Sequence, residues 1–308
     1  MYNNIVLKKL RGVKKMKSGF VSIIGRPNTG KSTLLNTLVN NKIAIVSDVA
    51  GTTRNSIHGV YNDKDTQIVF VDTPGIHKPV DKLGKELNKE AYNSLDDIDV
   101  ILFLVDASSG FGKGDKFIIN ALKNIEVPVI LILNKIDKMN DEQIMSSINT
   151  YKDLYDFAEI IPISALKNDN VDRLIKVLKT YLNDNVKYYD DGIITNASKY
   201  FLASEFVREK ILSLTNDEVP HSVTCVTTSY QEKTNIVNIS VDIIVSRASL
   251  KKIIIGKHGS MLKEIGSRAR VDIENRLGKQ VYLELYVKTI ENWRDKERYL
   301  KEFGIIDE

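Results

Sequence analysis

Short apolar runs alternate with helical stretches between residues 18 and 182. Runs at 20–24, 69–71, 129–133 and 160–163 have the length of buried strands, and polar residues follow each of them. Strands separated by helices favour a parallel sheet covered on both faces. The pattern therefore predicts an α/β domain with a doubly wound, mostly parallel sheet.

The pattern changes after residue 182. A polar stretch at 183–196 is typical of a linker, although its two tyrosines indicate that part of it packs against a domain. Residues 197–308 predict a smaller α+β domain with the order α-β-β-α-α-β. Its elements are expected at 199–214, 222–230, 236–245, on both sides of 256–259, and at 281–287. A chain of 308 residues is long enough for two cores.

A phosphate-binding motif lies between the first predicted strand and the first helix. Residues 25–32 read GRPNTGKS, which fits G-x-x-x-x-G-K-[ST]. Its glycines let backbone N–H groups surround phosphates, and the following helix adds its positive dipole end. Lys31 supplies charge and Ser32 a hydroxyl ligand for Mg²⁺. The predicted contacts are Gly25, Arg26, Pro27, Asn28, Thr29, Gly30, Lys31 and Ser32.

Two later strand ends select the base. Asn134, Lys135 and Asp137 belong to an N-K-x-D motif, in which the carboxylate accepts from both donors of guanine while the lysine stem covers a ring face. After the strand at 160–163 comes Ser164-Ala165-Leu166, where the Ala165 N–H can donate to the guanine oxygen. The sequence thus predicts GTP and GDP as ligands.

The third phosphate has its own predicted sensors. Asp72-Thr73-Pro74-Gly75 ends the strand at 69–71, so that Asp72 holds Mg²⁺ through water and the Gly75 N–H meets the γ-phosphate. In the loop Gly51-Thr52-Thr53-Arg54, Thr53 is the favoured metal ligand, with Thr52 as the alternative. Such loops order around the γ-phosphate and relax after hydrolysis.

The residue that orients the attacking water in several GTPases is a glutamine. Here Ile76 stands in that place, and an alkyl side chain cannot fill the role. His77 is expected to be a bystander. Slow intrinsic turnover follows.

These motifs carry a resemblance. GRPNTGKS, GTTR, DTPG, NKID and SAL, in this order and in single copy, resemble the Era family of GTPases. The resemblance implies a potassium ion near Asn28 that assists hydrolysis without the glutamine, so that Asn28 joins Lys31, Thr53, Asp72 and Gly75 in catalysis. It also implies 16S ribosomal RNA of the small subunit, near its 3′ end, as the partner, and 30S subunit maturation as the task.

The second domain carries a signal of its own. Gly256-Lys257-His258-Gly259 lies between two predicted helices, which is typical of a KH domain whose loop clamps single-stranded nucleotides. The predicted RNA contacts are Gly256, Lys257, His258, Gly259, Lys251, Lys252 and Lys263. A solvated helix face is the plain alternative for the surrounding charges, and Arg268 and Arg270 in particular are compatible with packing or solubility alone. Trp293 is expected to pack rather than to stack on bases.

The net charge of +4 has a local origin. Residues 1–15 hold five basic residues and no acidic one, so the positive balance comes from this stretch. The basic extension, 1–17, is compatible with an RNA arm, with peripheral contact at the inner face of the cell membrane, or with a true start at Met16, which we favour. A single cysteine, Cys225, excludes an internal disulfide and suits a cytoplasmic protein. Mg²⁺ is the one metal that the motifs require.

The sequence therefore predicts a monomeric GTP-hydrolysing switch that acts on RNA. A membrane-associated signalling GTPase and an RNA-binding protein with a non-hydrolysing nucleotide site remain the alternatives. A tRNA-modifying or tandem-domain GTPase would need a helical insertion or a second phosphate loop, and neither is visible.

Overall fold

The computed structural model describes residues 16–47, 49, 52–75, 82–93, 97–123 and 125–306. The predictions for Gly51, Ile76, His77 and residues 1–15 lie outside the described residues.

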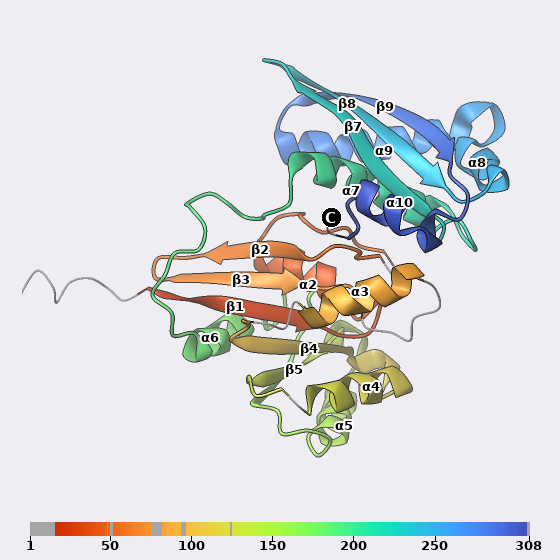
Figure 1. Ribbon diagram of the computed structural model, residues 1–308. Helices are drawn as coiled ribbons and strands as arrows, with labels where there is room; N and C mark the ends of the chain where they lie inside the picture. The colour runs from red at the N-terminus through yellow and green to blue at the C-terminus, as the bar shows by residue number, and fades with distance from the viewer. Residues whose placement is uncertain are drawn as a thin grey trace, which may run out of the picture.

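The first domain is built on a six-stranded sheet with the order β2-β3-β1-β4-β5-β6 (Figure 1). The strands are β1 (Lys17–Ile24), β2 (Ile57–Asn62), β3 (Thr66–Asp72), β4 (Val100–Asp106), β5 (Val129–Asn134) and β6 (Glu159–Pro162). β2 runs antiparallel to β3, and the other neighbouring pairs are parallel. The predicted doubly wound, mostly parallel sheet is confirmed.

Helices cover both faces of this sheet. They are α2 (Lys31–Leu38), α3 (Lys82–Asn93), α4 (Lys113–Leu122), α5 (Asp141–Tyr151) and α6 (Val171–Tyr181). Successive residues of β4 point to opposite faces of the sheet. Leu102 packs in one core with α2 and α6, whereas Phe103 packs in the other core with α4 and α5. Both side chains are fully buried, as the period of a strand requires.

The second domain has the predicted order of elements. They are α7 (Lys199–Leu214), β7 (Val223–Glu232), β8 (Ile236–Val245), α8 (Ala248–Ile255), the turn η3 (Lys257–Gly259), α9 (Ser260–Leu277) and β9 (Gln280–Thr289). The sheet order is β7-β8-β9, with β8 parallel to β9 and antiparallel to β7. A short turn η4 (Trp293–Asp295) and the helix α10 (Glu297–Glu302) end the described chain.

The segment 183–196 follows an edge of the first sheet. The side-chain oxygen of Gln67 accepts hydrogen bonds from the backbone N–H groups of Tyr188 and Tyr189, at 2.7 and 2.9 Å. The Tyr188 ring also packs edge-on against Phe20, with centroids 4.6 Å apart. The predicted packing of these tyrosines against a domain is confirmed.

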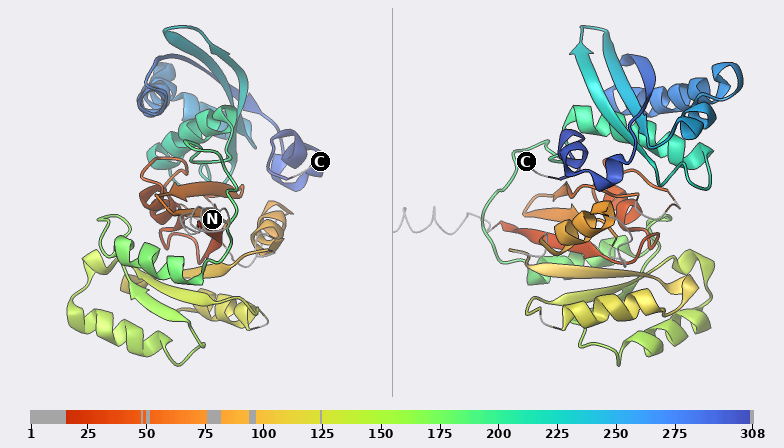
Figure 2. Two further views of the ribbon diagram at one scale, coloured as in Figure 1. Left: turned by 90° about the vertical axis from the view of Figure 1, so that its left-hand side faces the viewer. Right: turned by 45° about the vertical axis from the view of Figure 1, so that its right-hand side comes forward.

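The two domains pack directly against each other, and the two views of Figure 2 show them in contact. Trp293 is fully buried in one cluster with Leu83 and Leu87 of α3, so it packs, as expected. Arg54 of the first domain reaches the second, where it donates to the Val223 carbonyl at 2.8 Å and lies over the Trp293 ring.

Among the residues described, we find no helix long and apolar enough to cross a membrane. Within the same ranges, no group of three or more His, Cys, Asp or Glu side chains is arranged to hold a metal.

Candidate nucleotide and RNA sites

The phosphate loop joins the end of β1 to the first turn of α2. Gly30 has a φ of 98°, and a Cβ there would lie 2.4 Å from Asn134 Nδ2, so the position requires glycine. The Lys31 ammonium donates to the carbonyl oxygens of Gly25, at 3.1 Å, and Arg26, at 2.9 Å. Burial lowers the pKa of Lys31 to about 8. The loop thus combines a buried cation with a helix N-terminus, which suits phosphate.

Three oxygen-bearing side chains meet at the start of α2. The Ser32 hydroxyl donates to Asp72 Oδ2 at 2.9 Å, and its oxygen lies 3.0 Å from the Thr53 hydroxyl. Thr53 is 3.5 Å from the same carboxylate oxygen. The fold therefore brings together the side chains that the sequence predicts for Mg²⁺, from three separate segments.

The donor set fits that ion. Asp72 is fully buried, and its second oxygen, Oδ1, has no hydrogen-bond partner among the described residues. Burial raises the pKa of Asp72 to about 6, while the Lys31 charge opposes the rise. Carboxylate and hydroxyl oxygens are the ligands that Mg²⁺ prefers, and a cation beside Asp72 would favour its charged form.

The two neighbouring threonines make different hydrogen bonds. The Thr52 hydroxyl donates to the Val49 carbonyl at 2.5 Å, so it is engaged within its own loop. The Thr53 hydroxyl instead faces Ser32. The arrangement favours Thr53 as the metal ligand.

The side chain of Arg26 does not line the nucleotide pocket. Its Nε forms an ion pair of 2.8 Å with the fully buried Asp115 of α4, and its Nη2 donates to Ser109 Oγ at 3.2 Å. The guanidinium therefore joins the phosphate loop to α4. Sequence reasoning missed this role, because nothing in the motif marks its partner about ninety residues away.

Other predicted residues of the site have structural partners. The Thr29 hydroxyl donates to the Arg26 carbonyl at 3.0 Å, and the buried Thr73 hydroxyl donates to the Ile23 carbonyl at 3.1 Å. Pro74 is buried beside it. The pocket in front of the phosphate loop is lined by Pro27, Asn28, Gly30, Lys31, Ser32, Thr33, Ile45, Val46, Ser47, Val49, Thr52, Thr53, Gly75 and Lys135.

The base-selecting motifs lie side by side at the ends of β5 and β6. The buried Asn134 donates to the Thr29 carbonyl at 2.8 Å and accepts from the Ala165 N–H at 3.0 Å. The asparagine thus ties the phosphate loop to the loop after β6, and the Ala165 N–H that we expected to meet guanine bonds to Asn134 in this structure. The exposed Asp137 accepts from the Ser164 hydroxyl at 2.5 Å.

Lys135 and Leu166 flank this end of the site. The Lys135 ammonium bonds the Asn28 carbonyl and Asp106 Oδ2, both at 2.7 Å. Its head is therefore fixed, which leaves the stem as the part that can cover a base. Leu166 is 71% exposed, as an apolar residue at the mouth of a base site would be.

A groove in the second domain lies between α9 and β9. Its volume is about 440 Å³, and its lining residues are Gly259, Leu262, Lys263, Gly266, Ser267, Arg270, Val281, Tyr282, Leu283 and Leu285. Of the predicted RNA contacts, Gly259 and Lys263 belong to this lining. Gly266 allows the close approach, since a Cβ there would lie 3.3 Å from Leu285.

The glycine-containing turn closes one end of the groove. Gly256 and Gly259 have φ of 72° and 78°, and a Cβ on Gly256 would lie 2.7 Å from that of Met261. Lys257 and His258 are exposed on the turn, and Lys252 is exposed on α8 next to the half-buried Lys251. Two glycines leave part of the turn's backbone uncovered by side chains, which suits a clamp on phosphates.

Sequence reasoning missed the strand side of the groove. Tyr282 of β9 lines the groove and is 54% exposed, and Tyr286, outside the lining, is 51% exposed, although aromatic side chains usually bury more of their surface. The alternating residues 281–287 carried the signal, because exposed aromatic rings on one face of a strand are stacking platforms for bases. Arg270 also lines the groove.

These two sites define a P-loop GTPase fused to a KH domain. The chain matches a family model described as a 50S ribosome-binding GTPase over residues 20–135, and one described as a KH domain over residues 218–294. It is similar over its length to the crystal structure of Era in complex with MgGDPNP and nucleotides 1506–1542 of 16S ribosomal RNA. A second similar structure is an Aquifex aeolicus Era variant bound to GDP·AlF4⁻. Each is 43% identical, with 95% of this chain and 100% of that chain covered and a TM-score of 0.92.

The chain belongs to the Era family of GTPases. It is an enzyme that hydrolyses GTP, with guanine nucleotide and Mg²⁺ as its cofactors. The predicted family, fold class and activity are confirmed.

Proposed function

We propose that this GTPase binds 16S ribosomal RNA through its KH domain and assists assembly of the 30S ribosomal subunit. The observation that carries the proposal is the full-length likeness to Era in a complex that holds both MgGDPNP and a 16S RNA segment. The chain has a site of each kind: the nucleotide pocket lies on the first domain, and the groove for RNA lies on the second.

Within the GTPase site, Lys31 and the loop at 25–32 would hold the phosphates, while Ser32, Thr53 and Asp72 would hold Mg²⁺. The ion supplies charge neutralisation on the transferred phosphoryl group. The protein itself positions the reacting groups. Thr53 would bind the metal when GTP is present, and the Gly75 N–H would donate to the γ-phosphate. Asn134, Lys135, Asp137 and residues 164–166 select guanine.

Asn28 is the proposed neighbour of a potassium ion that replaces the missing glutamine. It lines the pocket with a φ of 65°, which turns the loop at this point. GTP turnover is expected to be faster in potassium than in sodium at equal ionic strength, because a cation held in the right place stabilises the charge that develops in the transition state. Equal phosphate release in the two salts would remove potassium from the proposal.

RNA follows the groove between α9 and β9. The turn at 256–259 clamps the backbone, with Lys251, Lys252, Lys257, His258 and Lys263 adding charge, and Tyr282 stacks on a base. The functional units are residues 18–182, the linker 183–196 and residues 197–308, after the extension 1–17. We propose that the protein is a monomer in the cytoplasm. We also propose that it makes peripheral contact with the inner face of the cell membrane.

Crosslinking to total cellular RNA, with GDP or a non-hydrolysable GTP analogue bound, tests the proposal. Sequencing of the attached fragments should show enrichment near the 3′ end of 16S RNA. Enrichment in large-subunit RNA would instead favour the task that the description of the first family model names. Diffuse crosslinks that ignore the nucleotide would contradict a switch on ribosomal RNA.

A further inference from the structure

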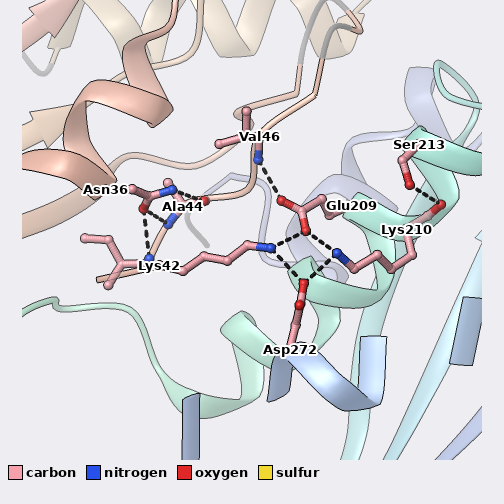
Figure 3. A network of polar contacts seen from close by, with 9 residues as sticks. Asn36, Lys42, Ala44, Val46, Glu209, Lys210, Ser213 and Asp272 are labelled. Carbon is pink, nitrogen blue, oxygen red and sulfur yellow. Dashed lines mark hydrogen bonds and ion pairs between the residues drawn. The ribbon is translucent and has the colours of Figure 1, made fainter. Parts of the chain in front are cut away.

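One loop of the GTPase domain touches both the nucleotide pocket and the KH domain. We call residues 42–47, 49 and 52–54 the sensor segment. Ile45, Val46 and Ser47 line the pocket, as do Thr52 and Thr53. The opposite side of the segment contacts α7 and α9 of the KH domain (Figure 3). Anything that moves these helices therefore acts on the segment.

Arg208 of α7 holds the end of the segment that carries Thr53. The arginine side chain is 1% exposed and forms two hydrogen bonds of 2.7 Å with the Glu205 carboxylate. Its Nη2 also donates to the backbone carbonyl of Thr52. A planar guanidinium fixed by a bidentate partner keeps its remaining donors in a set direction. The Thr52 carbonyl is thus held by a rigid donor, one residue before Thr53.

Glu209, the next residue of α7, holds the other end. Its Oε1 accepts from the Val46 N–H at 3.0 Å. Its Oε2 pairs with Lys42 at 2.5 Å and with Lys210 at 2.8 Å, and both lysines also pair with Asp272 of α9. Figure 3 shows this closed square of charges between the two domains. Partial burial alone would raise the pKa of Asp272, but the hydrogen bonds from Lys210 and Lys42 outweigh it and lower the pKa.

We propose that Arg208 and Glu209 are positioning residues for GTP hydrolysis, supplied by the KH domain to the GTPase site. They hold the two ends of the sensor segment so that the Thr53 hydroxyl stays beside Ser32. Neither side chain lines the pocket, so neither touches the reacting atoms. The inference rests on the proposed role of Thr53 at Mg²⁺.

The expected signature separates positioning from general stability. A variant that loses the contacts of the sensor segment with α7 should still bind GDP, because the phosphate loop and the base-selecting motifs have partners within their own domain. The loss appears in kcat for GTP and in the Mg²⁺ concentration that gives half-maximal rate. A displacement of about an ångström costs up to about 100-fold in rate.

The test compares Arg208→Lys and Arg208→Gln with Arg268→Gln in the full-length protein. Arg268 is the matched control, since it also pairs with a glutamate of its own helix, Glu264 at 2.7 Å, but lies 54% exposed and outside the groove lining. We expect kcat to fall about 10- to 100-fold for the Arg208 variants and the half-saturating Mg²⁺ to rise, with GDP affinity within about twofold. Hydrogen exchange should rise in the sensor segment and stay unchanged in residues 25–32.

Lys42→Met keeps the inference testable if the Arg208 variants do not fold. Lys42 is 37% exposed, and partly exposed ion pairs contribute about 1 kcal/mol or less, so a fivefold smaller kcat is the expected limit. Hydrogen exchange of the Lys42→Met variant should rise in the sensor segment. Unchanged exchange and kcat in the folded variants would overturn the inference.

A Thr53→Ala variant separates the two ideas. If Thr53→Ala changes the Mg²⁺ dependence and the Arg208 variants do not, the positioning role is wrong while the proposed function stands. If Thr53→Ala leaves Mg²⁺ dependence unchanged, the assignment of the metal ligand itself is wrong.

Discussion

The phosphate loop and the sensor segment meet at a pair of hydroxyls, Ser32 and Thr53, yet different parts of the molecule hold them. The phosphate loop is fixed within its own domain by Asn134, by Lys135 and by the pair of Arg26 with Asp115. The sensor segment is held by Asn36 of its own domain and, in addition, by α7 of the KH domain. The phosphate loop therefore has its contacts within the GTPase domain, whereas the sensor segment also has contacts with the RNA-binding domain.

This difference has a thermodynamic consequence. Two sites that share a movable element influence each other equally, because the change in affinity is reciprocal. If Arg208 and Glu209 couple the two sites as proposed, a nucleotide that shifts the sensor segment changes the RNA affinity, and RNA changes the nucleotide affinity by the same factor. The phosphate loop alone would give no such coupling.

The largest expected effect comes from a substitution in the phosphate loop. In Lys31→Met the buried ammonium is lost, and phosphate release should fall roughly 100- to 1,000-fold, as when one preorganised electrostatic contact is removed. The control is Lys138→Met, at an exposed position after β5. A Lys31 variant that hydrolyses GTP at the normal rate would contradict the role of the loop.

The next largest effect is a change in which base the nucleotide site accepts. Asp137→Asn replaces the acceptor for both guanine donors, so GTP affinity should fall at least about 100-fold while xanthosine triphosphate gains. Competition with a fluorescent guanine nucleotide measures both, and Asp141→Asn, at an exposed position in the first turn of α5, is the control. Unchanged GTP affinity would remove Asp137 from the base site.

The smallest effect acts on the domain that anchors the sensor segment. Tyr282→Ala removes an exposed ring from the groove, and since stacking contributes about 1–3 kcal/mol per base, RNA affinity should fall about 5- to 150-fold. Tyr200→Ala, an exposed tyrosine of α7 outside the groove lining, is the control. Titration of a labelled single-stranded RNA would detect the change, and equal affinity for both variants would place the RNA elsewhere.

Sequence reasoning predicted the elements well where local pattern decides them. The helix expected at 199–214 and the strand at 236–245 have those bounds in the structure, because caps, periodicity and turn residues are local signals. The motifs for nucleotide likewise predicted that Ser32, Thr53 and Asp72 would meet. Strand-end motifs of a parallel sheet gather at one edge, so their order in the chain is enough.

The contacts between domains had no such signal. Arg208 and Glu209 stand in a helix that looks like any charged helix, and their partners Thr52 and Val46 lie more than 150 residues away. Burial distinguishes them, since Arg208 is 1% exposed where an ordinary surface arginine is solvated. Burial depends on how two folded domains pack, which neither periodicity nor spacing encodes.

The most direct test of the account measures RNA affinity in two nucleotide states. A labelled RNA with the sequence of the 3′ end of 16S RNA is titrated with the full-length protein bound to GDP or to a non-hydrolysable GTP analogue, for the natural chain and for Arg208→Lys. If Arg208 links the two sites, the natural chain has different RNA affinities in the two states, and the ratio for the variant is closer to one. Equal affinities in both states of the natural chain, or the same ratio in the variant, would contradict it.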